Sequence, residues 1–412
     1  MRLLVISQYF WPENFRVNEL VTELVKRGHE VTVLTGYPNY PEGVIFLEFK
    51  AHPENFSLFA GAQVLRVPMA PRGKGAIRLM LNYLSFAVSA AICGSWKLRG
   101  QQFDAIFSFE PSPITAVLPA VLLRRLKMSP LLLWVLDLWP ETLSAVGVVR
   151  SQRVLRLVGH MVSFIYRRCD RILVQSRGFA HSVEKYAGSA GDRIRYFPGW
   201  TEGLFSGALD AVKPAPELEP YADGFNILFA GNIGEAQDFP AIIDAAERLK
   251  HRQDIRWLVV GDGRAAGYVC DEVAKRGLQN RLIMLGRFPL ERMPSFFSGA
   301  DALLVSLKSD PIFSLTIPGK VQSYLGVGIP LLGMLDGEGR KVIEESEGGL
   351  VTCAGDGAGL AENVLRLSEL TADQRRAMGE RGRAYGKREF DRDVLIDALE
   401  LHFHDALLDN SL

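Results

Sequence analysis

The stretch from Ser309 to Pro330 combines proline, glycine and lysine in a way that could bind an anion. Pro318 suits the first turn of a helix, and the free amides of that turn, with the ammonium group of Lys320, form an anion site. A diphosphate leaving group fits this site, and the alternative is that Lys320 is an ordinary solvated helix lysine. The residues of the stretch expected to contact the ligand are Asp310, Ser314, Thr316, Gly319, Lys320 and Ser323.

Two carboxylates, Asp137 and Glu141, lie four residues apart just after the apolar run from Leu131 to Val135. A carboxylate just past a buried strand can orient or deprotonate a sugar hydroxyl. Capping of a helix by Asp137 is the alternative. Asp137, Glu141 and Lys320 are therefore the candidate catalytic residues.

Small residues follow the run from Phe225 to Ala230. They are Gly231, Asn232 and Gly234, and their size lets backbone amides approach a diphosphate. We expect all three to contact a phosphorylated ligand.

A second glycine-rich turn, Gly261-Asp262-Gly263, is similar to the glycine motif that binds dinucleotides. Arg287 could correspond to the arginine that binds the 2′-phosphate of NADP in such proteins. The turn follows the second expected strand of its half rather than the first, which argues against nicotinamide binding. A tight turn or a loop that contacts a nucleotide is the preferred interpretation. Gly261, Asp262, Gly263 and Arg287 are therefore also candidates for ligand contact.

The loop after the first expected strand is aromatic and lacks the glycines that a dinucleotide needs. It presents Trp11, Asn14 and Arg16, that is, an aromatic face, an amide and a cation. These groups suit a sugar or a lipid-linked acceptor, and simple aromatic packing of the loop is the alternative.

Short β-branched runs alternate with helical patterns in both halves of the chain, which indicates βαβ units and parallel sheets. The runs expected as strands are residues 3–7, 30–35, 105–109, 131–136 and 171–175, followed by 225–230, 256–261, 282–285, 302–306 and 330–334. The fold class is therefore α/β, with two doubly wound domains. Ligands of such sheets bind at the carboxyl ends of the strands, which leads us to expect function in a cleft between the domains.

The 412 residues are too many for one ordinary core, so two domains of roughly 200 residues each are expected. A proline-rich stretch between the two halves suits a linker. We expect an N-terminal domain at 1–200, a linker at 201–224, a C-terminal domain at 225–387 and a helix at 388–412 that crosses back to the first domain.

The formal net charge is zero, so no global field indicates a nucleic-acid partner. The four cysteines are far apart, which fits neither a disulfide framework nor a zinc site. The seven histidines show no metal-ligand spacing. Buried free thiols in a reducing cytoplasm are expected, and the N-terminus reads as a strand rather than a secretory signal.

Residues 79–96 carry no charge and approach the length of a membrane-spanning helix, although several are polar. The basic residues Arg72, Lys74, Arg78, Lys97 and Arg99 surround this segment. Peripheral contact with the inner face of the cytoplasmic membrane is expected, and a buried helix of the first domain is the alternative.

The sequence resembles the family 4 glycosyltransferases over its whole length, particularly the WbuB-like type of colanic-acid and O-antigen pathways. The motifs that carry the resemblance are residues 6–13, 36–41, 137–141, 230–234 and 316–320. The resemblance implies the GT-B fold, in which the C-terminal domain binds the sugar nucleotide and the N-terminal domain binds the acceptor.

The resemblance further implies a retaining transferase that needs no metal. Its donor would be a UDP- or GDP-sugar of fucose or N-acetylfucosamine type, with UDP preferred, and its acceptor a polyprenyl-diphosphate-linked saccharide. The glutamate pair usual in the family is absent, because its positions fall on Leu315 and Ser323. The usual Arg and Lys after the first strand of the second domain are missing too, so Lys320 and Arg287 would carry the diphosphate charge.

Two other functions remain open. Sugar-nucleotide 2-epimerases share the two-domain architecture, and loss of the glutamate pair would also fit an inactive membrane-associated assembly protein. Incubation with the donor alone separates the first of these from a transferase, because an epimerase converts the donor to an isomer. Absence of any thermal shift with the donor would favour the second.

Overall fold

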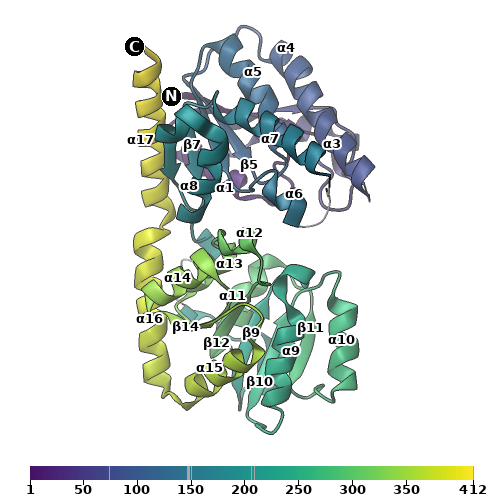
Figure 1. Cartoon of the computed structure of the whole chain (residues 1–412), viewed down its shortest axis with the longest axis vertical. Coiled ribbons are helices and arrows are strands. Elements are labelled where there is room, and N and C mark those ends of the chain that lie inside the picture. The colour runs from purple at the N-terminus through teal and green to yellow at the C-terminus, as the bar shows by residue number, and fades with distance from the viewer. Residues whose placement is uncertain (74, 146–148, 150, 206, 208, 412) are drawn as a thin grey trace. The chain divides into compact units, whose positions relative to one another are not determined.

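The computed structural model of the chain describes residues 1–411 except 74, 146–148, 150, 206 and 208. The chain divides into two compact units, unit 1 with Met1–Phe197 and Leu395–Leu412, and unit 2 with Pro198–Val394. Each unit contains one largely or wholly parallel sheet with helices packed on it (Figure 1). The prediction of an α/β protein with two doubly wound domains is therefore confirmed.

Unit 1 is built on an eight-stranded sheet in the order β3-β4-β2-β1-β5-β6-β7-β8. All neighbouring strands are parallel except β3, which runs antiparallel to β4. Strands β1, β5 and β6 are buried along nearly their whole length, as continuous apolar runs in a covered parallel sheet should be. The strands are β1 (Arg2–Ile6), β2 (Glu30–Gly36), β3 (Leu58–Phe59), β4 (Ala62–Val67), β5 (Ala105–Glu110), β6 (Leu131–Val135), β7 (Arg171–Val174) and β8 (Ile194–Tyr196).

The helices of unit 1 cover this sheet with amphipathic faces. In α1, Val17, Leu20, Val21 and Leu24 recur at helical spacing and are all buried. The helices are α1 (Arg16–Lys26), α2 (Leu47–Ala51), α3 (Ala76–Ser89), α4 (Ser95–Lys97), α5 (Leu118–Lys127), α6 (Glu141–Ala145), α7 (Gln152–Tyr166) and α8 (Arg177–Ala187).

The last helix of the chain, α17 (Arg392–Ser411), returns to unit 1 and lies against its strands and the end of α1 (Figure 1). Glu400 accepts a bond from Arg27 at 3.0 Å and pairs with His29 at 2.6 Å, and Phe403 packs edge-on against Phe107 of β5. The prediction of a C-terminal helix that crosses back is confirmed. The helix begins at Arg392 rather than at 388, because α16 continues to Glu389.

Unit 2 is built on a six-stranded sheet in the order β11-β10-β9-β12-β13-β14, in which all neighbours are parallel. Strand β9, the first of the unit, is central, so the loop after it lies between the loops of its two neighbours. The strands are β9 (Phe225–Ala230), β10 (Ile255–Val260), β11 (Leu282–Gly286), β12 (Ala302–Ser306), β13 (Leu331–Met334) and β14 (Gly349–Thr352).

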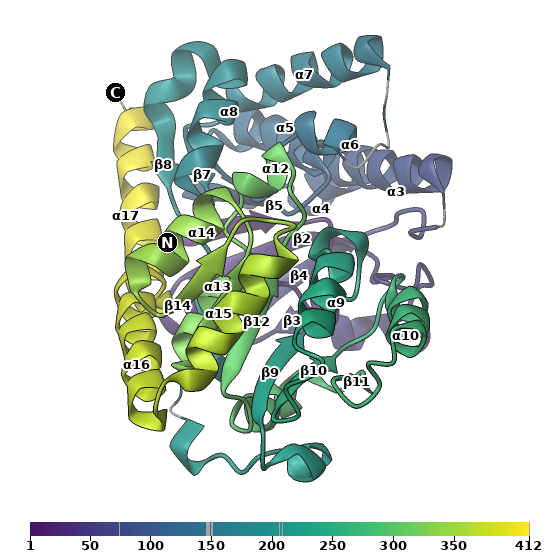
Figure 2. The same ribbon diagram turned by 60° about the horizontal axis from the view of Figure 1, so that its bottom comes forward.

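Two apolar clusters, one on each face of this sheet, form the core of unit 2. Helices α9 and α15 pack on one face and α13 on the other (Figure 2). The helices are α9 (Phe239–Arg248), α10 (Ala266–Lys275), α11 (Met293–Phe297), α12 (Pro311–Ser314), α13 (Gly319–Val327), α14 (Gly337–Ser346), α15 (Gly357–Glu369) and α16 (Ala372–Glu389).

The segment expected as a linker, residues 201–224, packs against unit 2 where the structure describes it. Ala215 and Leu218 are buried in one of the apolar clusters of that unit. Glu217 forms a two-pronged ion pair with Arg292, with N–O distances of 2.8 and 2.7 Å. The segment therefore lies on the surface of unit 2 instead of hanging free.

Candidate functional site

Helix α13 is fastened to the carboxyl end of β9, the central strand of unit 2. The hydroxyl of Tyr324 accepts from the N–H of Ala230 at 3.2 Å and donates to the carbonyl oxygen of the same residue at 3.1 Å. Tyr324 is buried, so both bonds are shielded from water. The start of α13 is thereby held beside the loop that begins at Gly231.

Lys320, at the second position of α13, has an ammonium group with no anionic partner among the described residues. Its Nζ lies 3.6 Å from the centre of the Phe229 ring, a cation–π contact, and burial lowers the pKa of the group to about 7. Among the described residues no side chain caps the start of the helix, and although the N–H of Val321 donates to the carbonyl oxygen of Pro318 at 2.9 Å, the N–H groups of Gly319 and Lys320 have no described partner. A cation and helix amides at one point form an anion site.

Gly231 leaves the space that this site needs. A Cβ atom at that position would lie 2.8 Å from Cε and 3.0 Å from Nζ of Lys320, and the backbone has a φ of +135° that favours glycine. Any larger residue would therefore displace the ammonium group. This contact explains why a glycine must follow β9.

The glycines of the turn after β10, Gly261-Asp262-Gly263, are explained by packing between loops, without a bound dinucleotide. A Cβ on Gly261 would lie 1.9 Å from the carbonyl oxygen of Gly231, and the N–H of Ile233 donates to the carbonyl oxygen of Asp262 at 2.9 Å. The carboxylate of Asp262 accepts from the N–H of Gly263 at 2.7 Å within its own turn. The glycines thus let two neighbouring loops pack backbone against backbone.

Several polar residues predicted at the anion site form hydrogen bonds within their own segment. Asp310 caps α12 by accepting from the N–H of Ile312 at 2.8 Å. The hydroxyls of Ser314 and Thr316 donate to the carbonyl oxygens of Pro311 and Ile312, at 2.8 and 3.3 Å. These side chains shape the approach to α13, and no described contact joins them to Lys320.

The other predicted residues of unit 2 differ in exposure. Gly234 is partly buried, its N–H accepted by the Gln237 side chain at 3.0 Å, whereas Asn232 and Gly319 are exposed and Ser323 is buried within α13. Arg287 is exposed after β11, an edge strand two strands away from β9. The sheet order therefore brings the loops after β9 and β10 to Lys320 and leaves Arg287 at the margin.

In unit 1, Asp137 follows β6 with its carboxylate already bonded. One oxygen accepts from the hydroxyl of Thr142 at 2.6 Å and the other from the indole N–H of Trp139 at 3.0 Å. Burial raises the pKa of Asp137, and these two hydrogen bonds act in the opposite direction. The carboxylate is thus rigidly held at the end of a buried strand.

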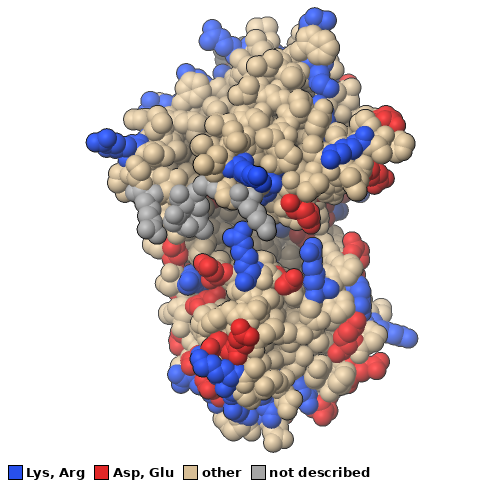
Figure 3. Space-filling view, turned by 90° about the vertical axis from the view of Figure 1, so that its right-hand side faces the viewer, with Lys and Arg blue, Asp and Glu red and all other residues tan. Residues whose placement is uncertain are grey.

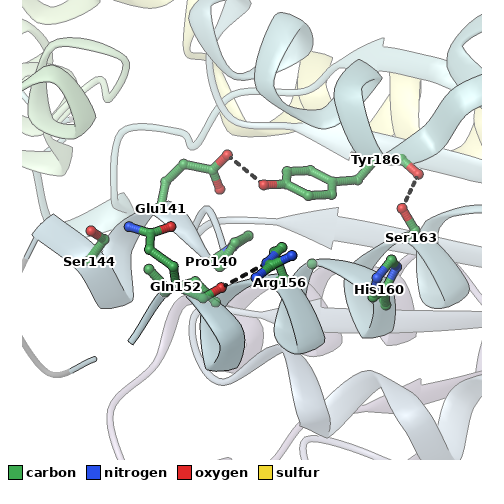
Figure 4. Close-up of a pocket in the computed structure, with 10 residues that line it drawn as sticks. Pro140, Glu141, Ser144, Gln152, Arg156, His160, Ser163 and Tyr186 are labelled. Atoms are coloured by element: carbon green, nitrogen blue, oxygen red, sulfur yellow. Dashed lines mark hydrogen bonds between the residues drawn. The ribbon is translucent and has the colours of Figure 1, made fainter. Parts of the chain in front are cut away.

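Glu141, the second predicted carboxylate, faces a different group. Its Oε1 accepts from the hydroxyl of Tyr186 at 3.1 Å, beside a pocket of about 510 Å³ between α6, α7 and α8 (Figure 4). The two carboxylates are therefore held by different partners, although they are only four residues apart.

The aromatic loop after β1 is held by a buried carboxylate, Glu13. It accepts from the N–H groups of Asn39 and Tyr40, both at 2.7 Å, and from that of Phe10 at 3.1 Å. Burial raises the pKa of Glu13, while the three backbone donors counteract this rise. Two loops at the carboxyl end of the sheet are joined by this one side chain.

The predicted acceptor residues of this loop lie in different surroundings. The ring of Trp11 packs against Phe56 and Phe59, with centroid distances of 5.1 and 5.3 Å, which is the packing alternative stated above. Asn14 is exposed and Arg16, the first residue of α1, is partly buried. The indole of Trp11 thus has a structural role, whether or not it also contacts a ligand.

Sequence reasoning did not find Glu110, the last residue of β5. It is fully buried, and no side chain hydrogen bonds to its carboxyl group among the described residues. Burial, and then the neighbouring Asp137 carboxylate, raises the pKa of Glu110 well above its ordinary value. The signal was a glutamate that ends a buried apolar run. Tyr324 was missed as well, because only the fold brings it to β9.

The uncharged segment noted above forms α3, a π-helical turn (Ala90–Gly94) and α4, with one face buried and one exposed. By length and composition, Ile77–Lys97 could cross a membrane, but the fold holds it through its polar residues. Asn82 is buried and accepts from the side chain of Gln8 at 2.8 Å. The exposed face is apolar and consists of Ile77, Met80, Leu81, Leu84, Val88, Ile92 and Trp96.

The fold of the whole chain is shared with GT-B enzymes. HepE from Anabaena, solved in complex with UDP, has a TM-score of 0.70 at 14% identity, covering 98% of this chain and 100% of that one. A protein from Listeria monocytogenes described as a putative UDP-N-acetylglucosamine 2-epimerase is also similar, with a TM-score of 0.62 at 14% identity, covering 98% of this chain and 97% of that one. At these identities the likeness defines the GT-B fold alone.

The sequence comparisons favour a glycosyltransferase over a sugar-nucleotide epimerase. Residues 14–200 match the Glycosyl transferase 4-like domain, and residues 224–369 match Glycosyl transferases group 1. A relative from Escherichia coli strain K12, WcaI, named as a glycosyl transferase of colanic acid biosynthesis, is 26% identical over 80% of this chain and 82% of its own. The chain is therefore a glycosyltransferase of GT-B fold that carries a family 4-type domain followed by a group 1 domain.

Proposed function

We propose that this glycosyltransferase moves a sugar, with retention of anomeric configuration, from a nucleoside diphosphate donor to a lipid-linked saccharide in surface polysaccharide biosynthesis. The pathway named for WcaI supports a role in polysaccharide biosynthesis, and the UDP bound to HepE supports UDP as the carrier. The lipid-linked acceptor rests on the sequence resemblance. A sugar of fucose or N-acetylfucosamine type rests on the sequence resemblance. The proposal includes no metal ion. Among the described residues, no group of three or more His, Cys, Asp or Glu side chains is placed to hold one.

The observation that carries this proposal is the ammonium group of Lys320 beside Gly231 and the start of α13. A largely buried cation that has no anionic partner among the described residues gains most from an anion that replaces lost water. The diphosphate of a sugar nucleotide supplies that anion, and its charge grows as the bond to the sugar breaks. Lys320 therefore stabilises the leaving group more strongly in the transition state than in the ground state.

In the proposed reaction an acceptor hydroxyl attacks C1 of the donor sugar on the face from which the diphosphate departs. The C1–oxygen bond to the diphosphate breaks as the new glycosidic bond forms. Asp137, which is held by Thr142 and Trp139, and Glu141 are the groups of unit 1 proposed to orient the acceptor or assist removal of its proton. Asn14 and Arg16 are proposed to line the acceptor side.

The first experiment is a thermal-shift panel of nucleoside diphosphates, followed by turnover of the matching sugar nucleotides. We expect UDP to raise the unfolding temperature and Lys320→Met to lower turnover by about 10²- to 10³-fold, as loss of one transition-state donor does. Lys275→Met, which removes a lysine 74% exposed on α10, is the matched control and should leave both unchanged. Equal turnover in the two variants would remove Lys320 from the site.

Incubation with the donor alone distinguishes the reaction classes. A transferase leaves the sugar nucleotide intact or hydrolyses it slowly, and proton NMR then shows one anomer of one sugar. Conversion of the donor to its 2-epimer would replace the proposed transfer with epimerisation. No stabilisation by any nucleotide would indicate an inactive assembly protein.

We also propose that unit 1 contacts a membrane surface through the exposed face of α3 to α4. In Figure 3 the viewed face of unit 1, in the upper half, is mostly uncharged, and most of the charged side chains on it are Lys or Arg. An apolar helix face flanked by Arg78, Lys97 and Arg99 suits the boundary of a bilayer with anionic headgroups. Lys74, expected at the same surface, lies outside the described residues.

Sedimentation with vesicles of phosphatidylglycerol and phosphatidylethanolamine tests this contact. Leu81→Glu, at a residue 54% exposed on α3, should release most of the bound protein, whereas Leu401→Glu, at a residue 64% exposed on α17, should not. Equal binding of both variants, or no binding of the parent protein, would contradict the proposal. Either result would leave the nucleotide site untouched.

A further inference from the structure

The pocket between α6, α7 and α8 has polar groups on two sides. Gln152, Arg156 and His160 lie on successive turns of α7, and Glu141 and Tyr186 lie opposite them (Figure 4). The spacing of four residues places the three side chains of α7 along one stripe. At about 510 Å³ the pocket is in the size range of small-molecule sites.

The wall formed by Glu141 is fixed in position. The backbone carbonyl of Tyr186 accepts from Ser163 at 2.9 Å, and its ring hydroxyl donates to Glu141 (Figure 4). Burial, and then the nearby Glu141 carboxylate, raises the pKa of Tyr186 to about 12, so the hydroxyl keeps its proton and remains a donor. Glu141 therefore has a defined orientation before any ligand arrives.

Hydrogen-bonding capacity remains on both walls. The second carboxylate oxygen of Glu141 is buried and has no partner among the described residues. Arg156 makes one long bond, 3.4 Å, to the carbonyl oxygen of Gln152, and its other donors are free of described partners, as is the imidazole of His160. The one unmet buried acceptor, on Glu141, favours a ligand that can donate to it, and the exposed side chains of Arg156 and His160 are free to turn toward that ligand.

The mixture of groups selects the chemical class of the ligand. A phosphate site would gather cations and exclude a carboxylate, because the carboxylate repels the anion. Here a carboxylate, an amide, an imidazole and a guanidinium surround one space, which suits hydroxyl groups that both donate and accept. A neutral sugar ring presents several such hydroxyls at once.

We propose that this pocket is a saccharide subsite of unit 1, in which Glu141 and the α7 residues Arg156 and His160 bind hydroxyls of an acceptor sugar. The inference rests on the proposed transfer to a saccharide. It changes the role of Glu141 from a candidate proton acceptor to a group that holds the acceptor. Asp137, bonded to Thr142 and Trp139, then remains the candidate for assisting removal of the acceptor's proton.

Saturation-transfer NMR on the full chain tests the subsite, with methyl glycosides of glucose, galactose and N-acetylglucosamine as probes and UDP present throughout. At least one glycoside should bind, and Arg156→Gln and His160→Ala should each weaken it on the order of tenfold, as for loss of one hydrogen bond to a charged group. Arg153→Gln is the matched control, because Arg153 lies on the same helix but does not line the pocket.

Three results would overturn the subsite. They are no binding of any glycoside, binding that Arg156→Gln and His160→Ala leave unchanged, and displacement of the glycoside by inorganic phosphate. Stabilisation by UDP, measured on the same samples, keeps the two proposals apart. If UDP does not stabilise the protein, the proposed function is contradicted. If UDP stabilises the protein but no glycoside binds, only the subsite is contradicted.

Discussion

The lowered pKa of Lys320 predicts that nucleotide binding takes up a proton. Burial brings this pKa to about 7, so at pH 8 roughly nine-tenths of the free protein carries a neutral amine at this position. A diphosphate beside the amine favours the charged form and raises its pKa. Each UDP bound at pH 8 should therefore take up as much as about 0.9 proton, against about 0.1 at pH 6.

The same linkage fixes how affinity depends on pH. Because only the protonated amine pairs with the diphosphate, the affinity for UDP should fall by up to tenfold for each pH unit above 7. Below pH 7 the group is already charged, so the affinity should level off. The second ionisation of a phosphate, near pH 6, is nearly complete at pH 8, so the uptake measured there reports on Lys320 alone. At pH 6 the free diphosphate is partly protonated and releases some of that proton on binding, so the net uptake at pH 6 should be close to zero or negative.

Titration calorimetry at pH 6 and pH 8, in buffers with different ionisation enthalpies, measures the proton uptake directly. Lys320→Met should bind UDP more weakly and lose the uptake at pH 8, whereas Lys275→Met should behave like the parent protein. If uptake is equal at the two pH values, or persists in Lys320→Met, the ammonium group of Lys320 does not contact the diphosphate.

Two further predictions concern stability. Tyr324→Phe leaves the buried N–H of Ala230 without its partner and should lower the free energy of unfolding of unit 2 by about 1–3 kcal/mol, measured by urea denaturation, with weaker UDP binding as α13 loosens. Glu110 has a raised pKa in the folded protein, so the folded state keeps a proton that the unfolded chain releases above about pH 4.5. Stability of unit 1 should therefore fall as pH rises from that value, by up to about 1.4 kcal/mol per unit until the folded pKa is passed. Glu110→Gln should abolish this slope, and an unchanged slope would show that Glu110 is ionised in the fold.

Much of the sheet architecture could be predicted from sequence because central parallel strands are continuous apolar runs. Strands β9 and β12 have the predicted bounds, and most of the others agree within one or two residues. The strands that were missed, β3, β4, β8 and β14, lie at or near the edges of the two sheets. They are short or include polar residues, as in Ile194–Tyr196, because an edge strand buries less of its surface.

The packing of the expected linker cannot be read from its composition, because tertiary contacts decide it. The segment with Pro214, Pro216 and Pro220 has the composition of a linker, yet Leu218 is buried and the N–H of Ala215 donates to Ser295 at 2.8 Å. Proline restricts the backbone in a free linker and in a packed 3₁₀ turn alike. A free linker and a packed 3₁₀ turn are therefore distinguished only by the apolar surface of unit 2 that the packed turn covers.

In the candidate site, backbone requirements can be inferred from sequence more readily than the partners of side chains. The need for glycine after β9 and β10 can be inferred from sequence, because only glycine permits close approach of a loop. The partners of Asp310, Ser314 and Thr316 cannot, since serine, threonine and aspartate bond to nearby backbone as readily as to a ligand. Lys320 was placed correctly at a helix start, but its contact with Phe229 depends on the sheet beneath it.

In the proposed diphosphate site, the charge that would bind the ligand is concentrated on one residue, Lys320. Residues 231–240 contain only Glu235 and Asp238 as charged groups, and the positions of the usual glutamate pair hold Leu315 and Ser323. Among the described residues no carboxylate pairs with the ammonium group of Lys320, which lies against the Phe229 ring and Gly231. Burial lowers the pKa of this group to about 7, so about half of it is neutral near pH 7. A site of this kind has no internal ion pair that a diphosphate would have to break on binding. Because this lysine loses its charge near neutral pH, the affinity for UDP should depend on pH. A site with a paired lysine or an arginine would not show this dependence.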